Sequence, residues 1–147
     1  MSFYEAGRAC FRVGSELSES FEVKMGLRHG CVMSPWLFNV YMDGVVREVY
    51  SRVNGMGVKL SVGGEREWLL SQLLFADDTA LVAESAEQLQ CLVREFGRVC
   101  ARQKLRVNVD KSKVMIVGED VDPSLLNIRL NGERMEVVTS FKYLGSY

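Results

Sequence analysis

Hydrophobic and polar positions repeat at two periods along the chain, and each period predicts a different kind of element. In two segments apolar residues recur every third or fourth position, which is typical of amphipathic helices. We expect one helix from about residue 36 to 53, whose apolar face comprises Leu37, Val40, Tyr41, Val45 and Val49. We expect the other from Ser85 to near Lys104, with an apolar stripe of Leu89, Leu92, Val93, Phe96 and Val99.

Shorter apolar or alternating segments between turn residues predict β-strands. Hairpins are expected to turn at Gly14-Ser15, Gly63-Gly64 and Asn131-Gly132. Residues 105–118 predict a strand pair or one bent strand, and residues 140–147 predict a final strand. Hairpins interspersed with two helices indicate the α+β class, in which helices pack on one face of an antiparallel sheet.

Two sequence signals mark the predicted helix starts. Ser34 and Pro35 fit an N-cap followed by the first helical position. Ser85 and Gln88 have the spacing of a capping box, in which each residue hydrogen bonds the backbone of the other.

Asp77 and Asp78 interrupt an apolar run that extends from Leu73 to Ala83. An unpaired buried carboxylate costs several kcal/mol, so two adjacent ones need a reason. A tight turn at residues 76–79 would place both at a hairpin tip, with Phe75 and Leu81 pointing into the core. There they would either be solvated turn residues or hold a divalent cation such as Mg²⁺, which prefers carboxylate oxygens.

Composition sets the limits of the interpretation. The chain has 147 residues, which suits one domain, and 48% of them are hydrophobic. The net charge is −1, whereas a stand-alone nucleic-acid-binding protein usually has a clear excess of basic residues. The four cysteines form no CxxC motif, which indicates reduced thiols. No membrane segment or signal peptide is recognisable, so we expect an intracellular protein, nuclear or cytoplasmic.

Basic residues concentrate between positions 94 and 113. Arg94, Arg98 and Arg102 recur every fourth residue and would share one face of the second helix. This face is either a strip that contacts phosphates or an ordinary solvated surface opposite the apolar stripe.

Four blocks, in this order, resemble the reverse transcriptase of non-LTR retrotransposons. They are GLRHGCVMSPWLFNVYMD, LLFADDTALVAES, LRVNVDKSKVMIVG and SFKYLGSY. The resemblance covers nearly the whole chain and implies part of the palm of a polymerase that copies an RNA template into DNA with two Mg²⁺ ions. The partners it implies are an RNA template, a DNA primer and deoxynucleotides. Residues 1–147 would thus form one partial reverse transcriptase domain.

The resemblance also implies roles for individual residues. Asp77 would be the main metal ligand and Asp78 its weaker partner, while Lys111 would protonate the departing pyrophosphate. A loop and helix start against the template and nucleotide would include His29, Gly30, Ser34 and Pro35. Tyr143 and Gly145 would belong to the segment that grips the primer end.

Simpler roles stay open for several of these residues. Gly30 could supply only a positive φ angle, and Lys111 could be a solvated strand end. Tyr143 could be a packing aromatic. His29 stands where the family usually has Gln, and imidazole offers both a donor and an acceptor only as a particular tautomer.

One expected residue is absent from the sequence. The family has a further catalytic Asp on a strand before the GLRHGCVMSP block, yet the first aspartate here is Asp43, inside the predicted helix. The sequence therefore predicts a partial palm that is inactive alone, with an open sheet edge that favours self-association. Two alternatives are a domesticated, non-catalytic module that binds nucleic acid or protein, and an unrelated α+β interaction domain.

Overall fold

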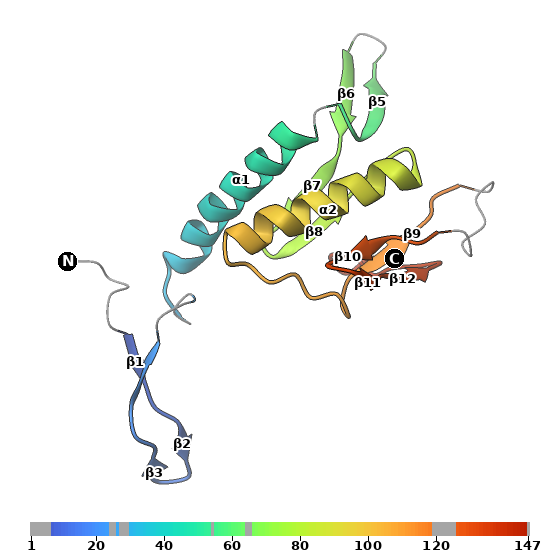
Figure 1. The fold of residues 1–147 in the computed structure, drawn as a ribbon. Coiled ribbons are helices and arrows are strands. Elements are labelled where there is room, and N and C mark those ends of the chain that lie inside the picture. Colours follow the sequence, from blue (N-terminus) through green and yellow to red (C-terminus); the bar gives the residue numbers. More distant parts are fainter. Residues whose placement is uncertain are drawn as a thin grey trace. The chain divides into compact units, whose positions relative to one another are not determined.

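A computed structural model describes residues 7–23, 26, 30–53, 55–63, 66–118 and 126–146 of the chain. The chain divides into two compact units, Met1–Phe38 and Asn39–Tyr147. Figure 1 shows the elements in their chain order. The helices of the described residues are α1 (Ser34–Arg52) and α2 (Ala86–Arg102).

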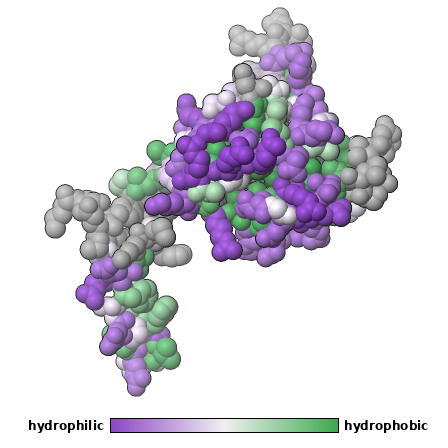
Figure 2. Space-filling view, in the orientation of Figure 1, coloured by the Kyte–Doolittle hydropathy of each residue, from purple (hydrophilic) through white to green (hydrophobic). Residues whose placement is uncertain are grey.

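The first unit contains one long hairpin. Strand β1 (Gly7–Ala9) pairs with β4 (Phe21–Val23), and further out β2 (Arg12–Val13) pairs with β3 (Glu16–Leu17), both antiparallel. This confirms the hairpin predicted around Gly14, which has a φ of 62°. Large apolar side chains, among them Phe11 and Val13, remain exposed on this hairpin (Figure 2).

The second unit contains two further hairpins before α2. Strand β5 (Val58–Val62) pairs with β6 (Arg66–Leu70), and β7 (Gln72–Phe75) pairs with β8 (Asp78–Leu81). Beyond the β7–β8 ladder, the Val82 N–H donates to the Ser71 carbonyl at 2.9 Å. Both predicted hairpins are therefore confirmed, although Gly64 lies outside the described residues.

The strands after α2 are shorter than the sequence predicts. They are β9 (Lys113–Met115), β10 (Arg129–Leu130), β11 (Glu133–Arg134) and β12 (Glu136–Val138). The β10–β11 hairpin turns at Asn131-Gly132 as predicted, with φ of 54° and 88°. Residues 105–112 form no strand, so the predicted strand pair over 105–118 reduces to β9.

The α+β class is confirmed, with one difference in pairing. Strands β9 and β12 pair in parallel, and the described strands form two-stranded pairs rather than one continuous sheet. The parallel pair was not predicted because apolar alternation fixes the face of a strand and not the direction of its neighbour.

Helix α2 follows the predicted pattern closely. The Ser85 hydroxyl accepts a hydrogen bond from the Gln88 N–H at 3.2 Å, which satisfies one free donor of the first turn. The predicted capping box is only half formed, because Oε1 of the Gln88 side chain has no hydrogen-bond partner. Hydrogen bonds from its own backbone N–H and then from Ser85 lower the pKa of Glu87.

The apolar stripe of α2 packs against the strands on either side of it in the sequence. Its buried members Leu92, Val93, Phe96, Val99 and Cys100 are each at most 8% exposed. Val93 belongs to a core cluster with residues of the C-terminal segments, and the half-buried Leu81 of β8 packs against it. The buried residues outside α2 in this cluster are Val114, Leu126, Ile128, Leu130 and Met135.

Helix α1 departs from the prediction in its start and its buried face. It begins at Ser34 instead of Trp36, and Met42 is buried while Val40 is 73% exposed. The buried row comprises Met42, Val45, Val49 and Val53. The helix has two adjacent apolar rows, and sequence spacing alone does not decide which of them is covered.

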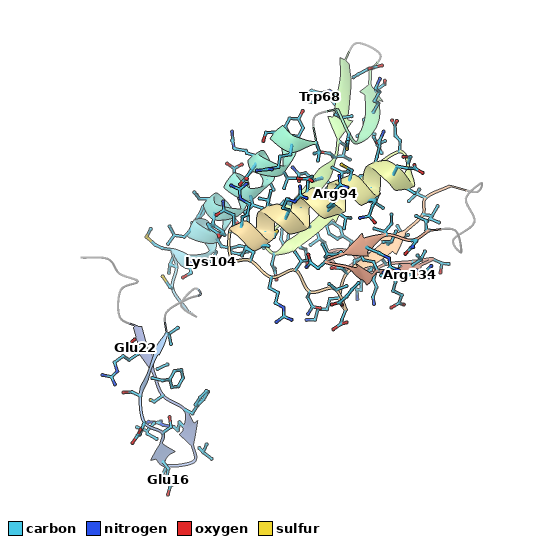
Figure 3. All side chains as sticks on the ribbon, viewed as in Figure 1. Glu16, Glu22, Trp68, Arg94, Lys104 and Arg134 are labelled. Carbon is cyan, nitrogen blue, oxygen red and sulfur yellow. The ribbon has the colours of Figure 1, made fainter. Side chains whose placement is uncertain are left out.

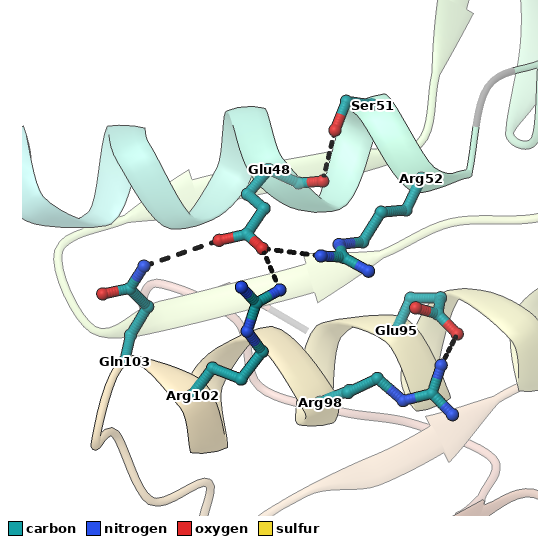
Figure 4. A network of polar contacts seen from close by, with 7 residues as sticks. All are labelled: Glu48, Ser51, Arg52, Glu95, Arg98, Arg102 and Gln103. Carbon is teal, nitrogen blue, oxygen red and sulfur yellow. Dashed lines mark hydrogen bonds and ion pairs between the residues drawn. The ribbon is translucent and has the colours of Figure 1, made fainter.

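Polar contacts join α1 to the end of α2 (Figure 4). Glu48 accepts from Arg52 at 2.9 Å, from Arg102 at 2.7 Å and from Gln103 at 3.4 Å. The Arg52 hydrogen bond is the largest of the contacts that lower the pKa of Glu48. The Tyr41 hydroxyl also donates to the Gln103 carbonyl. These contacts fix the C-terminal end of α2 beside α1.

All four cysteines are free thiols, and burial raises the pKa of Cys100 to about 11.

Neither α1 nor α2, the helices of the described residues, is long and apolar enough to cross a membrane.

Candidate functional site

The two adjacent aspartates lie at the tip of the β7–β8 hairpin. Phe75 pairs with Asp78, so Ala76 and Asp77 form a two-residue turn. Ala76 has a φ of 52°, whereas Asp77 has no positive φ. A positive φ at only the first turn residue is the pattern of a type II′ turn, where Gly is usual and Ala is strained. The predicted hairpin is confirmed, but its turn lies one residue earlier than the expected 76–79, so Asp78 is the first residue of β8.

The pairing register shows which side chains share each face of this hairpin. Gln72 and Leu81 lie on one face, and the Gln72 amide donates to the Val46 carbonyl of α1 at 3.3 Å. Phe75 and Asp78 lie on the other face, where Phe75 is 60% exposed. The prediction that Phe75 points into the core is therefore wrong, since it alternates with Leu74 and lies opposite Asp78.

Both carboxylates are exposed and available for a ligand. Neither Asp77 nor Asp78 makes a side-chain hydrogen bond or ion pair with another described residue. Within the described residues, no group of three or more His, Cys, Asp or Glu side chains is close enough to hold a metal ion. The hairpin presents two exposed carboxylates on a short turn, which are oxygen donors of the kind that Mg²⁺ prefers.

Lys111 occupies a turn instead of a strand end. Its N–H donates to Asn108 Oδ1 at 3.2 Å, and the Ser112 hydroxyl donates to the Asn108 carbonyl at 2.7 Å. Its side chain is exposed, and no hydrogen bond or ion pair in the described structure joins it to the aspartates. The neighbouring Lys113 is engaged differently, because its Nζ pairs with Glu136 at 2.6 Å.

The loop before α1 belongs to the first unit. Gly30 has a φ of 77°, which confirms the positive φ expected of it. Ser34 is only 4% exposed, and its N–H donates to the Cys31 carbonyl at 3.2 Å. Ser34 is the first helical residue rather than a cap before Trp36, and Pro35 follows it within the helix. His29 lies outside the described residues.

The C-terminal block forms a tight turn rather than the predicted final strand. The Tyr143 and Ser146 backbones exchange hydrogen bonds of 2.8 and 3.0 Å. Between them Leu144 and Gly145 have φ of 50° and 90°. Two consecutive positive φ angles are typical of a type I′ turn, which explains the glycine. Tyr143 is half-buried at the base of this turn.

The three arginines expected along one helix face have different partners. Arg102 forms an ion pair with Glu48 of α1, whereas Arg94 and Arg98 both form ion pairs with Glu95. Arg129, from β10, lines the same surface groove as Arg94 and Arg98. Sequence spacing could not have identified Arg129, because it joins the pair only through the packing of β10 on α2.

Comparisons with known proteins agree with the order of the motifs. Residues 2–147 match the family described as "Reverse transcriptase (RNA-dependent DNA polymerase)". The chain is also similar to the "Retrovirus-related Pol polyprotein from type-2 retrotransposable element R2DM" of Drosophila melanogaster, with 32% identity over 108 residues. That alignment covers 74% of this chain and 10% of the length of the relative.

Replacing Ala76 by Gly should stabilise the protein, because Gly adopts a φ near +52° without the steric cost that Ala incurs. We expect the free energy of unfolding to rise by about 0.5–1 kcal/mol in urea titrations. Ala80→Gly in β8 is the control, and it should destabilise by about 0.5–1 kcal/mol. Equal destabilisation by both variants would contradict the turn geometry at Ala76.

Proposed function

Because the chain belongs to the reverse transcriptase (RNA-dependent DNA polymerase) family of non-LTR retrotransposons, we propose that residues 1–147 supply part of the polymerase palm. The observation that carries this proposal is the β7–β8 turn, where Asp77 and Asp78 are exposed and have no hydrogen-bond or ion-pair partner among the described residues. The function of the complete domain would be DNA synthesis on an RNA template. Such work requires a nuclear or cytoplasmic location, where template and deoxynucleotides are present.

Asp77 and Asp78 would hold divalent cations in the complete domain. Bound Mg²⁺ supplies activation of the attacking primer hydroxyl and stabilisation of the leaving pyrophosphate. Asp77, within the turn, would be the main ligand, and Asp78, paired with Phe75 at the start of β8, the weaker one. The exposed outer face, with Phe75 and Leu73, leaves room for a primer end beside the carboxylates.

The remaining motif residues would contribute to the same reaction. Lys111 would give a proton to the departing pyrophosphate, and its side chain is exposed and unpaired within the described structure. Tyr143 and Gly145 would hold the primer end at their turn. The loop and helix start with His29, Gly30, Ser34 and Pro35 would lie against the template and the incoming nucleotide.

Residues 1–147 alone would not complete the metal site. Two metal ions about 3.5–4 Å apart need carboxylates from more than one segment. Among the described residues Asp43 does not join Asp77 and Asp78 in a group close enough to hold a metal ion. It pairs with Arg47 on α1 at 2.7 Å. The missing carboxylate would therefore come from a strand outside these residues.

A second candidate is a non-catalytic module that binds nucleic acid or protein. It is favoured by the absence, within the described residues, of any third acidic, His or Cys side chain near the aspartates. Activity of a longer polypeptide distinguishes the two candidates, because the module would stay inactive in every context.

We expect no primer extension by residues 1–147 with Mg²⁺ or Mn²⁺, and activity once an upstream family segment carrying the missing Asp is joined. In the joined protein Asp77→Asn should abolish synthesis, because it removes a charge that neutralises the metal ions. Lys111→Ala should slow synthesis by about 10²–10⁴-fold, as loss of a general acid does. Single-turnover extension of a radiolabelled primer measures both effects.

Two results would contradict this assignment. Extension by residues 1–147 alone that is lost in Asp77→Asn would show that the chain is catalytically complete. A joined protein that binds template and primer but stays inactive would favour the non-catalytic module. Lys104→Ala, at an exposed position beyond α2, serves as a charge-matched control for Lys111→Ala.

The exposed edges of the β7–β8 hairpin lead us to propose self-association. Among the described strands each pairs only with the other, and Leu73 and Phe75 are 44% and 60% exposed. Unpaired apolar edges favour pairing with another chain.

Sedimentation velocity should show an average mass that rises above 16.6 kDa as concentration increases. Leu73→Lys should suppress this rise, because a charge on the outer face opposes edge pairing. Val40→Lys is the control, since Val40 is 73% exposed on α1. A wild-type monomer at all concentrations would refute the proposal.

A further inference from the structure

A surface groove lies between α2 and the β10–β11 hairpin. None of the residues that line it belongs to the aspartate turn. The groove is open on the surface, with a volume of about 430 Å³. Arg94 and Arg98 line it from α2, and Arg129 lines it from β10. We call these three residues and the space between them the arginine groove. Figure 3 labels Arg94, which extends from α2 with 59% of its side chain exposed.

A largely buried carboxylate holds the two helix arginines in place. Glu95 is 11% exposed at its side chain, and its Oε1 lies 3.5 Å from Arg94 Nε and 3.0 Å from Arg98 Nη1. Figure 4 shows the Glu95–Arg98 contact. One carboxylate thus positions two guanidinium groups on the exposed side of the helix, which reduces the entropy they would lose on binding a ligand.

A separate set of hydrogen bonds fixes Arg129. The Gln90 side chain accepts from the Arg129 N–H at 2.7 Å and donates to the Arg129 carbonyl at 2.9 Å. The Arg129 guanidinium donates through Nη1 to the Gly132 carbonyl at 2.9 Å. The Gln90 amide thus hydrogen bonds both backbone groups of Arg129, as a residue of a paired strand would. These bonds fix β10 beside α2 and hold Arg129 at the groove.

Small and apolar residues also line the groove between the arginines. A Cβ atom on Gly97 would lie 2.6 Å from Leu130 Cδ1, so the glycine allows the hairpin to approach the helix closely. Gly97, Ala101 and Leu130 all line the groove. The result is a surface with an apolar floor and cationic walls.

The donors that remain determine the chemistry of the ligand. Each guanidinium has five N–H donors, and Arg98 and Arg129 each use Nη1, which leaves Nε and Nη2 of both without a partner among these contacts. Arg94 and Arg98 share the carboxylate of Glu95, and the Arg129 guanidinium contacts a carbonyl instead. The lining residues of the groove include three arginines and no acidic residue, so the groove has a surplus of positive charge. Fixed arginines with free paired donors match the geometry of phosphate oxygens.

We propose that the arginine groove binds the phosphodiester backbone of a single nucleic-acid strand, at a site distinct from Asp77 and Asp78. The choice of a nucleic acid over an acidic protein rests on the proposed function. The strand would lie along α2 with successive phosphates near Arg94, Arg98 and Arg129, and the apolar floor would contact sugar rings. RNA and DNA share this backbone chemistry.

The test measures binding of the full chain to a fluorescein-labelled 20-nucleotide RNA, to DNA of the same sequence and to poly-glutamate. Arg94→Gln/Arg98→Gln/Arg129→Gln removes the groove charges. The matched control Arg12→Gln/Arg47→Gln/Lys59→Gln removes three charges from other exposed positions. Circular dichroism establishes that both variants are folded, and Arg94→Lys/Arg98→Lys/Arg129→Lys keeps the charge while it removes paired donors.

We expect the groove variant to weaken binding at least tenfold, and the control variant less than threefold. The slope of log K against log salt should fall by roughly 2 for the groove variant, since each phosphate contact to a single strand contributes about 0.7. The lysine variant should bind with intermediate affinity, because lysine acts as a point charge. The RNA and DNA arms show which backbone binds more tightly.

Three outcomes would overturn the proposal. They are equal losses in the groove and control variants, no loss in either, and tighter groove-dependent binding of poly-glutamate than of both nucleic acids. A catalytically inactive joined polymerase with intact groove-dependent binding would refute the proposed function alone.

Discussion

Burial of one face of α2 is the interaction on which the second unit depends. Leu92, Val93, Phe96 and Val99 are almost fully buried, and they bring β8 from one side and β10 from the other onto a single helix. Burial of such side chains contributes about 1.5–3 kcal/mol each, far more than the exposed ion pairs around them. The aspartate turn and the arginine groove both acquire their positions from this packing.

Electrostatics determines where the aspartate turn forms, and packing holds its strands in place. Two adjacent carboxylates cannot remain in an apolar interior, so the chain reverses direction at them. The inner face of the hairpin is held through Gln72 and Leu81, and the strained turn at Ala76 is maintained by the paired strands. The result is a pair of exposed carboxylates on a packed support, which are oxygen donors of the kind that a divalent cation prefers.

Local rules predicted the features that depend on neighbouring residues. Ser85 as a cap, Asn131-Gly132 as a turn and the stripe of α2 follow from short-range chemistry, and so does the placement of Asp77 and Asp78. The rules failed where distant segments decide the outcome. The buried row of α1, the parallel β9–β12 pair and the exposure of Phe75 depend on which surface finds a partner. Arg129 lines the same groove as Arg94, and this too depends on the packing of distant segments.

The central claim is that the β7–β8 turn forms one side of a divalent-cation site. Paramagnetic broadening of amide NMR signals by Mn²⁺, an ion with oxygen ligands like those of Mg²⁺, tests it most directly. Signals of residues 75–79 should broaden first, at millimolar rather than micromolar Mn²⁺, and Asp77→Asn should remove the effect. Uniform broadening, or broadening centred on other acidic residues such as Asp43, would contradict it.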